Sequence, residues 1–519
     1  MNAFHFQALL RTASEHANFG RNESFLELCE EIIRNYGDDP QVLAKTSSLL
    51  TQYGFISDAK KCLQNALKIS PNNKKFLLNL AHVELLIGNR VQFKVIANSL
   101  LKLYPNCLYT LSNLIHLFEY SDEISDEERL TLAKRWGISA IDAAGGPKDR
   151  PPFRNTKNLP LRIGYMSADF CQHTVGILIK EVLAKHDPTK FVIYAYSSGF
   201  VHDWITDEIK KYCQFIDVTS LSDYELANRI TADQIDILVD LSGHTGGSRL
   251  AVCAYRPAPV IVCMLGYYAT TGLEYIDATI LDSWHITNST LNQFVEPITL
   301  LKPIRWCFYP AFPAPLISQP PCTQRGYIAF ASFNNTLKYN PAVFEVWSKI
   351  LHAVPQSRLI LKWRTFNDPE FKRKTIASFA DFGIDASRIE LRGPSFHMQM
   401  LEEYNDIDIA LDPFPFSGGA TSCEALYMGV PVITLPQERV VSRQTYAFLS
   451  SIGLSELIAK DQGDYINIAI QLAMDQKRLL EYRDNLRLQM LHSPLMNFKD
   501  FTSSLEFCLL KIYNQVSNK

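Results

Sequence analysis

The first part of the chain repeats one pattern of apolar and polar positions. Glycines recur every 34 residues, at Gly20, Gly54 and Gly88, and each lies between two stretches with helical amphipathic spacing. Glycine permits a tight turn between antiparallel helices, and Pro71 and Pro105, near the ends of the second and third copies, stop the second helix of each. The pattern predicts three helix–turn–helix repeats, near 6–39, 40–73 and 74–107. A degenerate helical pair follows to about residue 144.

A helix–turn–helix period of 34 residues resembles that of tetratricopeptide repeats. One such repeat cannot bury its own apolar face, so neighbouring repeats must stack. The stack leaves a concave surface that would bind an acceptor peptide, or a partner subunit by self-association. A structural cap for the next domain is the alternative interpretation.

Behind the repeats, the pattern changes to short apolar runs separated by helix-like segments. The first series lies at 161–167, 191–199, 215–219 and 235–243. After a proline-rich stretch, a second series lies at 327–334, 357–363, 389–394, 408–415 and 431–436. This alternation is typical of βαβ units with a parallel sheet that is buried on both faces. The predicted fold class is an α-helical solenoid followed by an α/β region with two Rossmann-like lobes.

These patterns predict three domains, which suits a chain of 519 residues. They are the repeats at 1–144, a first lobe at 160–302 and a second lobe at 322–519. The segment 142–160 is rich in Gly, Pro and charge, and it is predicted to be a linker. In doubly wound sheets, ligands bind beyond the carboxyl ends of the strands, so functional residues are expected there.

Charge and composition exclude several classes of partner. The chain has 51 Lys+Arg against 54 Asp+Glu, which removes the electrostatic argument for binding nucleic acid or an anionic membrane. No apolar run approaches the ~18 residues of a membrane span, and the N-terminus lacks the layout of a signal peptide. The eleven cysteines have neither zinc nor disulfide spacing. We therefore expect a cytoplasmic protein.

The segment PFPFSGGATSCEALYMGVPVIT (413–434) has the most specific local chemistry. Gly418 and Gly419 predict a flexible turn after a strand, and Thr421 and Ser422 open the helix that follows. Backbone N–H groups and hydroxyls at a helix start favour a phosphate or diphosphate. Glu424, in the first helical turn, would accept hydrogen bonds from ribose hydroxyls. An ordinary glycine turn with a Ser/Thr cap is the alternative.

Three further side chains follow predicted strands. Lys338 would place a positive charge on a diphosphate, His397 would reach a nucleoside, and His173 has a side-chain type suited to general-base work. A surface lysine and ordinary loop histidines are the alternatives. The D-x-D at 406–408 enters an apolar run, so the start of a strand explains it better than a metal site. No metal site is predicted, and Lys338 with the helix start would neutralise the diphosphate.

Together these segments resemble the catalytic region of O-linked N-acetylglucosamine transferases, and more narrowly their bacterial members and the SPINDLY branch. The resemblance rests on RIGYMSADFCQH, DILVDLSGHTGG, RPAPVIVCMLGYYATTGL, FASFNNTLK, DIALDPFPFSGGATSCEALYMGVPVITLP and SPLMNFKDFTSSLE, in this order over about 160–515. It implies an inverting, metal-independent GT-B glycosyltransferase. The donor would bind to the second lobe, and the Ser or Thr of a protein acceptor would lie on the side of the first lobe.

The resemblance also assigns roles to single residues. Lys338 matches a lysine on the diphosphate, Thr421 a phosphate-contacting threonine, and Glu424 an acidic residue that holds the ribose. His397 matches a histidine near the nucleoside. His173 matches the histidine proposed as the base near the acceptor. The loop that lines the sugar is matched by two residues, Leu265 and Gly266.

The chain departs from the family pattern at three positions. Gly419 replaces a histidine, Ala420 replaces a threonine, and Tyr268 replaces the proline that is common in the LGYP loop. These departures leave the donor open. UDP-GlcNAc is the first expectation, and GDP-fucose or a glucose donor is the alternative. The alternative outside enzymes is a repeat scaffold with a catalytically inactive nucleotide-binding region.

Overall fold

A computed structural model describes residues 3–155, 159–311 and 313–518, and the chain divides into two compact units. The first unit comprises Met1–Pro105, Ser318–Pro413 and Ile466–Gln476. The second comprises Asn106–Ile317, Phe414–Tyr465 and Lys477–Lys519. Residues 156–158 of the predicted linker lie outside the described residues, as do residues 1–2 and 519 of the outer predicted domains. The three predicted domain ranges stay a prediction.

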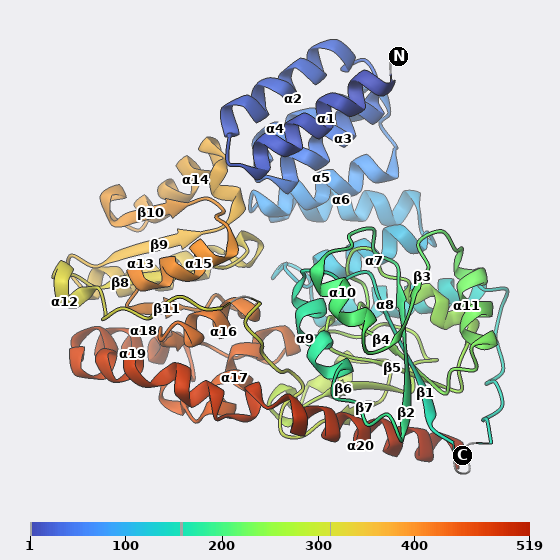
Figure 1. Cartoon of the computed structure of the whole chain (residues 1–519). Coiled ribbons are helices and arrows are strands. Elements are labelled where there is room, and N and C mark those ends of the chain that lie inside the picture. Colours follow the sequence, from blue (N-terminus) through green and yellow to red (C-terminus); the bar gives the residue numbers. More distant parts are fainter. Residues whose placement is uncertain (1–2, 156–158, 312, 519) are drawn as a thin grey trace. The chain divides into compact units, whose positions relative to one another are not determined.

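The first unit begins with three helical hairpins, drawn in blue in Figure 1. The helices are α1 (Ala3–Asn18), α2 (Asn22–Tyr36), α3 (Pro40–Gln52), α4 (Ile56–Ile69), α5 (Lys74–Leu86) and α6 (Arg90–Leu103). Each hairpin turns at one of the periodic glycines, whose φ angles are 70°, 91° and 79° at Gly20, Gly54 and Gly88. Glycine adopts this left-handed region without a steric penalty, so the period of the glycines is the period of the turns.

Four parallel strands form a sheet in the first unit, in the order β10-β9-β8-β11. Their bounds are β8 (Ala329–Ser332), β9 (Arg358–Lys362), β10 (Ile389–Arg392) and β11 (Ile409–Leu411). The helices of this segment are α12 (Cys322–Arg325), α13 (Pro341–Ala353), α14 (Pro369–Ala380) and α15 (His397–Glu403). Since all four strands are parallel, their carboxyl ends share one edge of the sheet.

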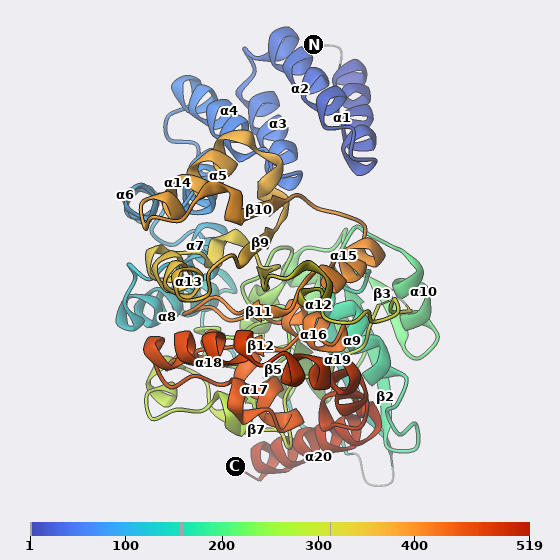
Figure 2. The same ribbon diagram turned by 90° about the vertical axis from the view of Figure 1, so that its left-hand side faces the viewer.

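The repeats pack directly on this α/β segment of the first unit, and Figure 2 shows α14 beside α4 and α5. Ser57 donates from its backbone nitrogen to Asp368, which caps α14, over 2.6 Å. Arg90 donates to the Tyr339 carbonyl over 2.8 Å. A Cβ on Gly54 would lie 1.8 Å from the Arg364 carbonyl oxygen, so the two backbones approach closely at this turn.

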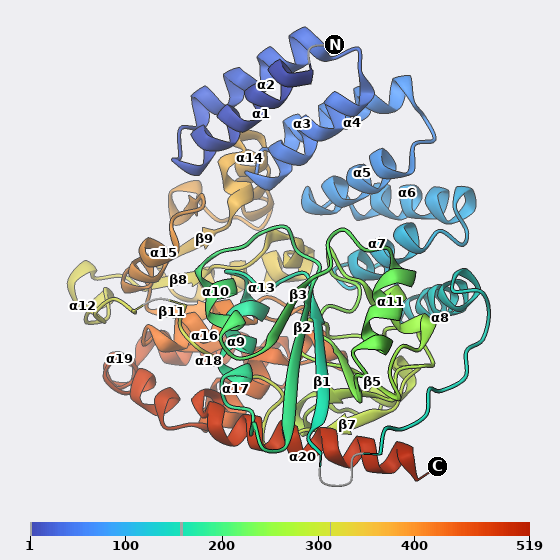
Figure 3. The same cartoon turned by 45° about the vertical axis from the view of Figure 1, so that its right-hand side comes forward.

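The second unit is built on a seven-stranded parallel sheet with the order β3-β2-β1-β4-β5-β6-β7 (Figure 3). The strands are β1 (Leu161–Ser167), β2 (Phe191–Ser197), β3 (Gln214–Asp217), β4 (Ile237–Asp240), β5 (Val260–Cys263), β6 (Ala278–Leu281) and β7 (Ile298–Leu300). Leu161 pairs with Phe191, and this register continues to Ser167 and Ser197. β4 and β5 are buried at every position, as expected for strands covered on both faces.

The remaining helices follow in chain order. They are α7 (Leu108–Phe118), α8 (Asp126–Ala143), α9 (Thr174–Leu183), α10 (Trp204–Lys210), α11 (Asp223–Ala232), α16 (Ala420–Tyr427), α17 (Gln444–Ile452), α18 (Gln462–Met474), α19 (Gln476–Leu491) and α20 (Phe498–Ser517). The short strand β12 (Val432–Ile433) follows α16. The predicted degenerate pair is α7 and α8. It packs within the second unit, where a Cβ on Gly137 would lie 1.9 Å from the Gly272 carbonyl oxygen.

The structure confirms the predicted fold class of helical repeats followed by two Rossmann-like lobes. Every predicted apolar run overlaps a strand, and β1 has the predicted bounds of 161–167. Three strands of the larger sheet, β5, β6 and β7, were not predicted. Over the described ranges, no helix combines the length and the apolar character needed to cross a membrane.

Candidate functional site

The predicted site residues divide between the two units. Lys338 and His397 belong to the first unit. The others belong to the second unit: His173, Leu265, Gly266, Gly418, Gly419, Thr421, Ser422 and Glu424.

The turn before α16 has the form that the sequence predicts. Gly419 occupies the N-cap position, and because it lacks a side chain it cannot cap the helix as Ser, Thr or Asp would. The positive end of the helix dipole is therefore not met by a carboxylate or hydroxyl from that position. Thr421 and Glu424 are partly exposed in the first turn. This arrangement suits an anion supplied from outside the chain.

Ser422 supports the same helix start from inside. Its hydroxyl hydrogen-bonds to the Thr445 hydroxyl over 2.8 Å, and its backbone N–H donates to the Gly419 carbonyl over 3.1 Å. The side chain is 3% exposed. Both of its donors are thus engaged within the protein, whereas Thr421, one residue earlier, is partly exposed.

Ser417, one residue before the turn, is fixed by a neighbouring loop. Its backbone nitrogen and its hydroxyl both donate to the Val441 carbonyl, over 3.1 and 2.8 Å, and its hydroxyl accepts from the Gln444 backbone nitrogen over 3.2 Å. Ser417 is 1% exposed. The conformation of the Gly418-Gly419 turn is therefore tied to residues 441–444, which sequence reasoning did not single out.

The predicted sugar loop is held in an unusual backbone conformation. Leu265 has a φ of 66°, which costs a non-glycine residue on the order of 1 kcal/mol or more. A Cβ on Gly266 would lie 2.1 Å from the Leu241 carbonyl oxygen, so only glycine fits. Two residues later, the Tyr268 ring meets the edge of Phe416 at 5.0 Å between centroids. The structure thus joins the 265–268 loop to the segment that carries Gly418 and Gly419.

His173 forms the N-cap of α9, beyond the carboxyl end of β1, and its side chain is 51% exposed. Its Nδ1 accepts a hydrogen bond from the Val175 backbone nitrogen over 3.3 Å. In the neutral ring the proton is therefore on Nε2, and Nε2 is a hydrogen-bond donor in this arrangement. Asp169, whose pKa is raised by burial, lies 3.7 Å from Nδ1 and would pair with the protonated ring.

Lys338 ends a short 3₁₀ helix, Thr336–Lys338, that follows β8. Its Nζ donates to Asn334 Oδ1 over 3.1 Å. Burial lowers the pKa of Lys338 to about 8, and the negative charge of Asp412 opposes that shift. Asp412 is 1% exposed and follows β11, the strand beside β8. A partly desolvated ammonium of this kind interacts strongly with a phosphate because water screens it poorly.

His397 begins α15, just beyond β10. β8 and β10 are parallel and are separated by β9, so Lys338 and His397 follow strands at the same edge of this sheet. Asp406 and Asp408 precede β11 instead. Asp406 pairs with two arginines, and Asp408 accepts from the Ala329 backbone nitrogen over 2.8 Å. The D-x-D therefore supports the start of a strand, as predicted.

A cavity of about 390 Å³ lies between the repeats and the α/β segment of the first unit. Helices α3 and α5 contribute Ser48, Thr51, Gln52, Asn79, His82 and Leu86, and the loops after β8 and β9 contribute Asn335, Trp363, Arg364 and Thr365. Burial, helped by the charge of Arg364, lowers the pKa of His82 to about 4, so this imidazole is neutral at pH 7. Apart from the charged Arg364, the lining offers neutral amides, hydroxyls and an imidazole, which suit a peptide backbone.

Among residues 3–155, 159–311 and 313–518, no three His, Cys, Asp or Glu side chains are grouped so as to hold a metal ion.

Comparison with known proteins identifies the family. The model of the family described as "Glycosyl transferase family 41" matches residues 121–304 and 323–505, which together make up more than half of the chain. The chain belongs to this family. The predicted resemblance is therefore confirmed at the level of the family, and the match begins within the α7–α8 pair rather than at the first sheet.

Relatives of this family member occur in plants and bacteria. A probable UDP-N-acetylglucosamine–peptide N-acetylglucosaminyltransferase SPINDLY of Hordeum vulgare is 34% identical over 403 residues, covering 76% of this chain and 42% of that protein. The SEC protein of Arabidopsis thaliana, which has the same probable activity in its name, is 27% identical and covers 70% of this chain and 39% of that protein. The chain thus matches less than half the length of these plant relatives.

A solved structure resembles the whole chain. A mutant O-GlcNAc transferase of Thermobaculum terrenum superposes with a TM-score of 0.88 at 29% identity, covering 99% of both chains. This match agrees with the fold of helical repeats and two Rossmann-like lobes.

Proposed function

We propose that this protein transfers a sugar, GlcNAc from UDP-GlcNAc, to Ser or Thr hydroxyls of proteins, with inversion at the anomeric carbon and without a metal ion. The observation that carries the proposal is the start of α16. Its glycine N-cap places no side chain over the positive end of the helix, and the turn packs on the 265–268 loop through Phe416 and Tyr268. Family membership and the names of the relatives agree with this activity.

The proposed reaction breaks the bond between the anomeric carbon and the diphosphate and forms a bond from that carbon to the acceptor oxygen. The leaving diphosphate gains negative charge, and the acceptor hydroxyl loses its proton. Preorganised donors that meet developing charge typically supply several kcal/mol. We assign this role to Lys338 and to Thr421 with the start of α16. The metal-free mechanism is proposed because these groups already supply positive charge.

The residues that contact the ribose, the nucleoside and the sugar are proposed from the family resemblance and, for Glu424, also from its partial exposure. Glu424 is partly exposed one turn after Thr421 and is proposed to accept from the ribose hydroxyls. His397 is proposed to contact the nucleoside. The 265–266 loop is proposed to line the sugar. In this proposal, residues 160–302 form the lobe on the acceptor side, and residues 322–519 form the lobe that binds the donor.

The role of His173 follows from its hydrogen bonds. With Nδ1 accepting from Val175, the neutral ring presents an Nε2–H, which orients an acceptor oxygen but does not take its proton. We therefore propose that His173 positions the acceptor in the arrangement seen here. For His173 to act as the base, the hydrogen bond from Val175 must break and the proton must move from Nε2 to Nδ1, so that Nε2 offers its lone pair to the acceptor hydroxyl. Asp169 would then stabilise the protonated imidazole.

The acceptor is proposed to be a protein segment that enters the cavity between α3, α5 and the loops after β8 and β9. Asn79 and the neutral His82 offer hydrogen bonds to a peptide backbone there. A cytoplasmic location and self-association through the repeats stay part of the expectation from the sequence. A second candidate function is transfer of fucose from GDP-fucose or of glucose, which is favoured by Gly419, Ala420 and Tyr268 at positions where the family pattern differs.

Thermal-shift measurements with UDP, GDP and their sugars test this proposal before any acceptor is known. We expect UDP-GlcNAc to stabilise the unmodified protein and to stabilise a Thr421→Val variant, which keeps the side-chain volume without the hydroxyl, less. Stabilisation by GDP-fucose alone would contradict UDP-GlcNAc as the donor and would favour GDP-fucose. A lack of stabilisation by every nucleotide, in a folded protein, would contradict the enzyme proposal and favour a scaffold.

A further inference from the structure

The segment that connects α7 to α8 contacts two parts of the proposed donor site in the second unit. These are the 265–268 loop and the 417–419 turn before α16. Glu119 and Tyr120 directly follow α7. Neither belongs to the predicted site, and both lie in the helical region that precedes the first sheet. Their contacts show what this region adds to the site.

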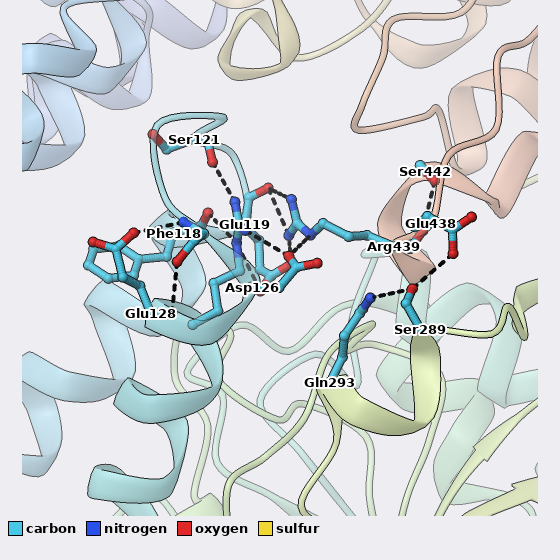
Figure 4. Close-up of polar contacts among 12 residues, drawn as sticks. Phe118, Glu119, Ser121, Asp126, Glu128, Ser289, Gln293, Glu438, Arg439 and Ser442 are labelled. Carbon is cyan, nitrogen blue, oxygen red and sulfur yellow. Dashed lines mark hydrogen bonds and ion pairs between the residues drawn. The ribbon is translucent and has the colours of Figure 1, made fainter. Parts of the chain in front are cut away.

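Glu119 binds the loop that fixes the turn before α16. Its carboxylate accepts from Arg439, whose guanidinium also donates twice to the Glu119 carbonyl over 3.3 Å (Figure 4). Glu119 is 5% exposed, and the Arg129 guanidinium lies 4.0 Å from its other carboxylate oxygen. Arg439 immediately precedes the short 3₁₀ helix Val440–Ser442. The Val441 carbonyl in that helix holds Ser417.

These bonds form one continuous connection from the helical pair to the donor turn. It runs from Glu119 to Arg439, along the backbone to Val441, and across two hydrogen bonds to Ser417 beside Gly418. A buried ion pair is costly to break from one side because the remaining charge stays desolvated. The position of this loop is therefore strongly tied to Glu119.

Tyr120 contacts the same turn and the sugar loop through its ring. It stacks on Phe416 with centroids 4.5 Å apart and planes 11° apart. Its hydroxyl lies 3.4 Å from that of Tyr268, whose ring also meets Phe416 edge-on. Tyr120, Tyr268 and Phe416 thus form one aromatic cluster. Phe416 leads to Gly418, and Tyr268 follows Leu265 and Gly266.

We propose that Glu119 and Tyr120 are positioning residues of the donor site. Together they hold the 265–268 loop and the 417–419 turn at a fixed separation, and this separation determines which sugar is accepted. The inference rests on the proposed function, since it concerns the donor of that reaction. A simple fastening of α7 and α8 to the second unit is the competing explanation, and it predicts a loss of stability without any change in donor preference.

The test measures kcat and donor KM separately with UDP-GlcNAc, UDP-glucose and GDP-fucose. Tyr120→Ala removes the stacked ring, and Tyr120→Phe keeps it. Glu119→Gln keeps the shape of the carboxylate without its charge. The matched controls are Phe153→Ala, whose ring meets Tyr513 of α20 edge-on, and Glu506→Gln, a buried carboxylate that binds His186.

We expect Tyr120→Ala to raise the donor KM about tenfold and to change the ratio of kcat/KM among the three donors. Without the Tyr120 ring, the 265–268 loop and the 417–419 turn lose the side chain that contacts both of them. Tyr120→Phe should restore most of the donor KM. Glu119→Gln should change the same constants in the same direction. The two controls should lower thermal stability by a comparable amount and leave the donor ratio unchanged. If Tyr120→Ala does not fold, Tyr120→Leu replaces it.

Two results would overturn the proposal in different ways. Donor constants that change no more in the Tyr120 and Glu119 variants than in the controls, with an active unmodified protein, would refute the positioning role alone. An unmodified protein that transfers none of the three sugars and binds none of the nucleotides would refute the proposed function, and the positioning role with it.

Discussion

Replacing Lys338 with methionine distinguishes two effects of its buried charge. The charge lowers the stability of the folded chain, and it is proposed to accelerate sugar transfer. Burial lowers the pKa of Lys338 from 10.5 to about 8, despite the opposing charge of Asp412. At about 1.4 kcal/mol per pH unit, holding this charge in the folded chain costs about 3 kcal/mol. The variant loses the hydrogen bond to Asn334, worth about 1 kcal/mol. Lys338→Met should therefore be at least as stable as the unmodified protein at pH 7.

The pH dependence of stability gives the sign of this effect. The folded chain releases the Lys338 proton near pH 8, whereas the unfolded chain holds it to about pH 10.5. Between these values the unfolded state binds more protons, so the unmodified protein gains stability relative to the variant as the pH rises. Below pH 8 the difference is constant and favours the variant. Chemical unfolding of both proteins at pH 7, 8.5 and 10 measures this difference.

Transfer should respond in the opposite direction. Removing one preorganised donor from a developing charge typically lowers kcat by 10²–10³, and we expect a loss of that size for Lys338→Met. In the unmodified protein, kcat/KM for the donor should fall above about pH 8, where the free ammonium loses its proton. Lys338→Arg should remove that decline, because a guanidinium stays charged. A folded Lys338→Met variant with an unchanged rate would refute the assignment, and so would a variant that is clearly less stable at pH 7.

Three further results are expected. Gly54→Ala should lower the free energy of unfolding by about 2–4 kcal/mol, because its Cβ would meet the Arg364 carbonyl at 1.8 Å. Gly88→Ala, which meets no atom within 4 Å, should cost only about 1 kcal/mol, and equal losses in the two variants would contradict this docking. Asn79→Ala should raise the KM of an acceptor peptide about fivefold and leave the donor KM unchanged, and steady-state kinetics that show the reverse would place the acceptor elsewhere. Excess EDTA should leave the transfer rate unchanged, whereas loss of rate that returns with a divalent cation would refute the metal-free mechanism.

The repeats and most strands could be predicted because their signals are local. Gly20, Gly54 and Gly88 mark the turns directly, since a positive φ is needed at each. Runs such as 161–167 are mostly apolar and are followed by helix-like segments. In contrast, β5, β6 and β7 are separated by 3₁₀ helices and loops rather than α-helices, so the alternation with helix-like segments that marked the other strands is absent there.

The predicted site residues depended on motifs, and their partners could not be found in that way. Glu119 and Arg439 are 320 residues apart, so no local pattern relates them. Asp412 lies inside the predicted run 408–415, and nothing in the sequence indicated its effect on Lys338. The use of His173 Nδ1 by the Val175 backbone depends on the geometry of the cap, which residue identity does not specify. Sequence reasoning identifies side chains with suitable chemistry, and the structure supplies their hydrogen bonds and burial.

Mass spectrometry of acceptor proteins after incubation with UDP-GlcNAc, UDP-glucose and GDP-fucose tests the central claim most directly, because it reports the sugar and the modified residue together. We predict the mass of one N-acetylhexosamine on Ser or Thr, with UDP-GlcNAc as the donor, and none of it with Lys338→Met. Modification with none of the three donors, by a folded protein supplied with Ser- and Thr-containing acceptors, would contradict the account.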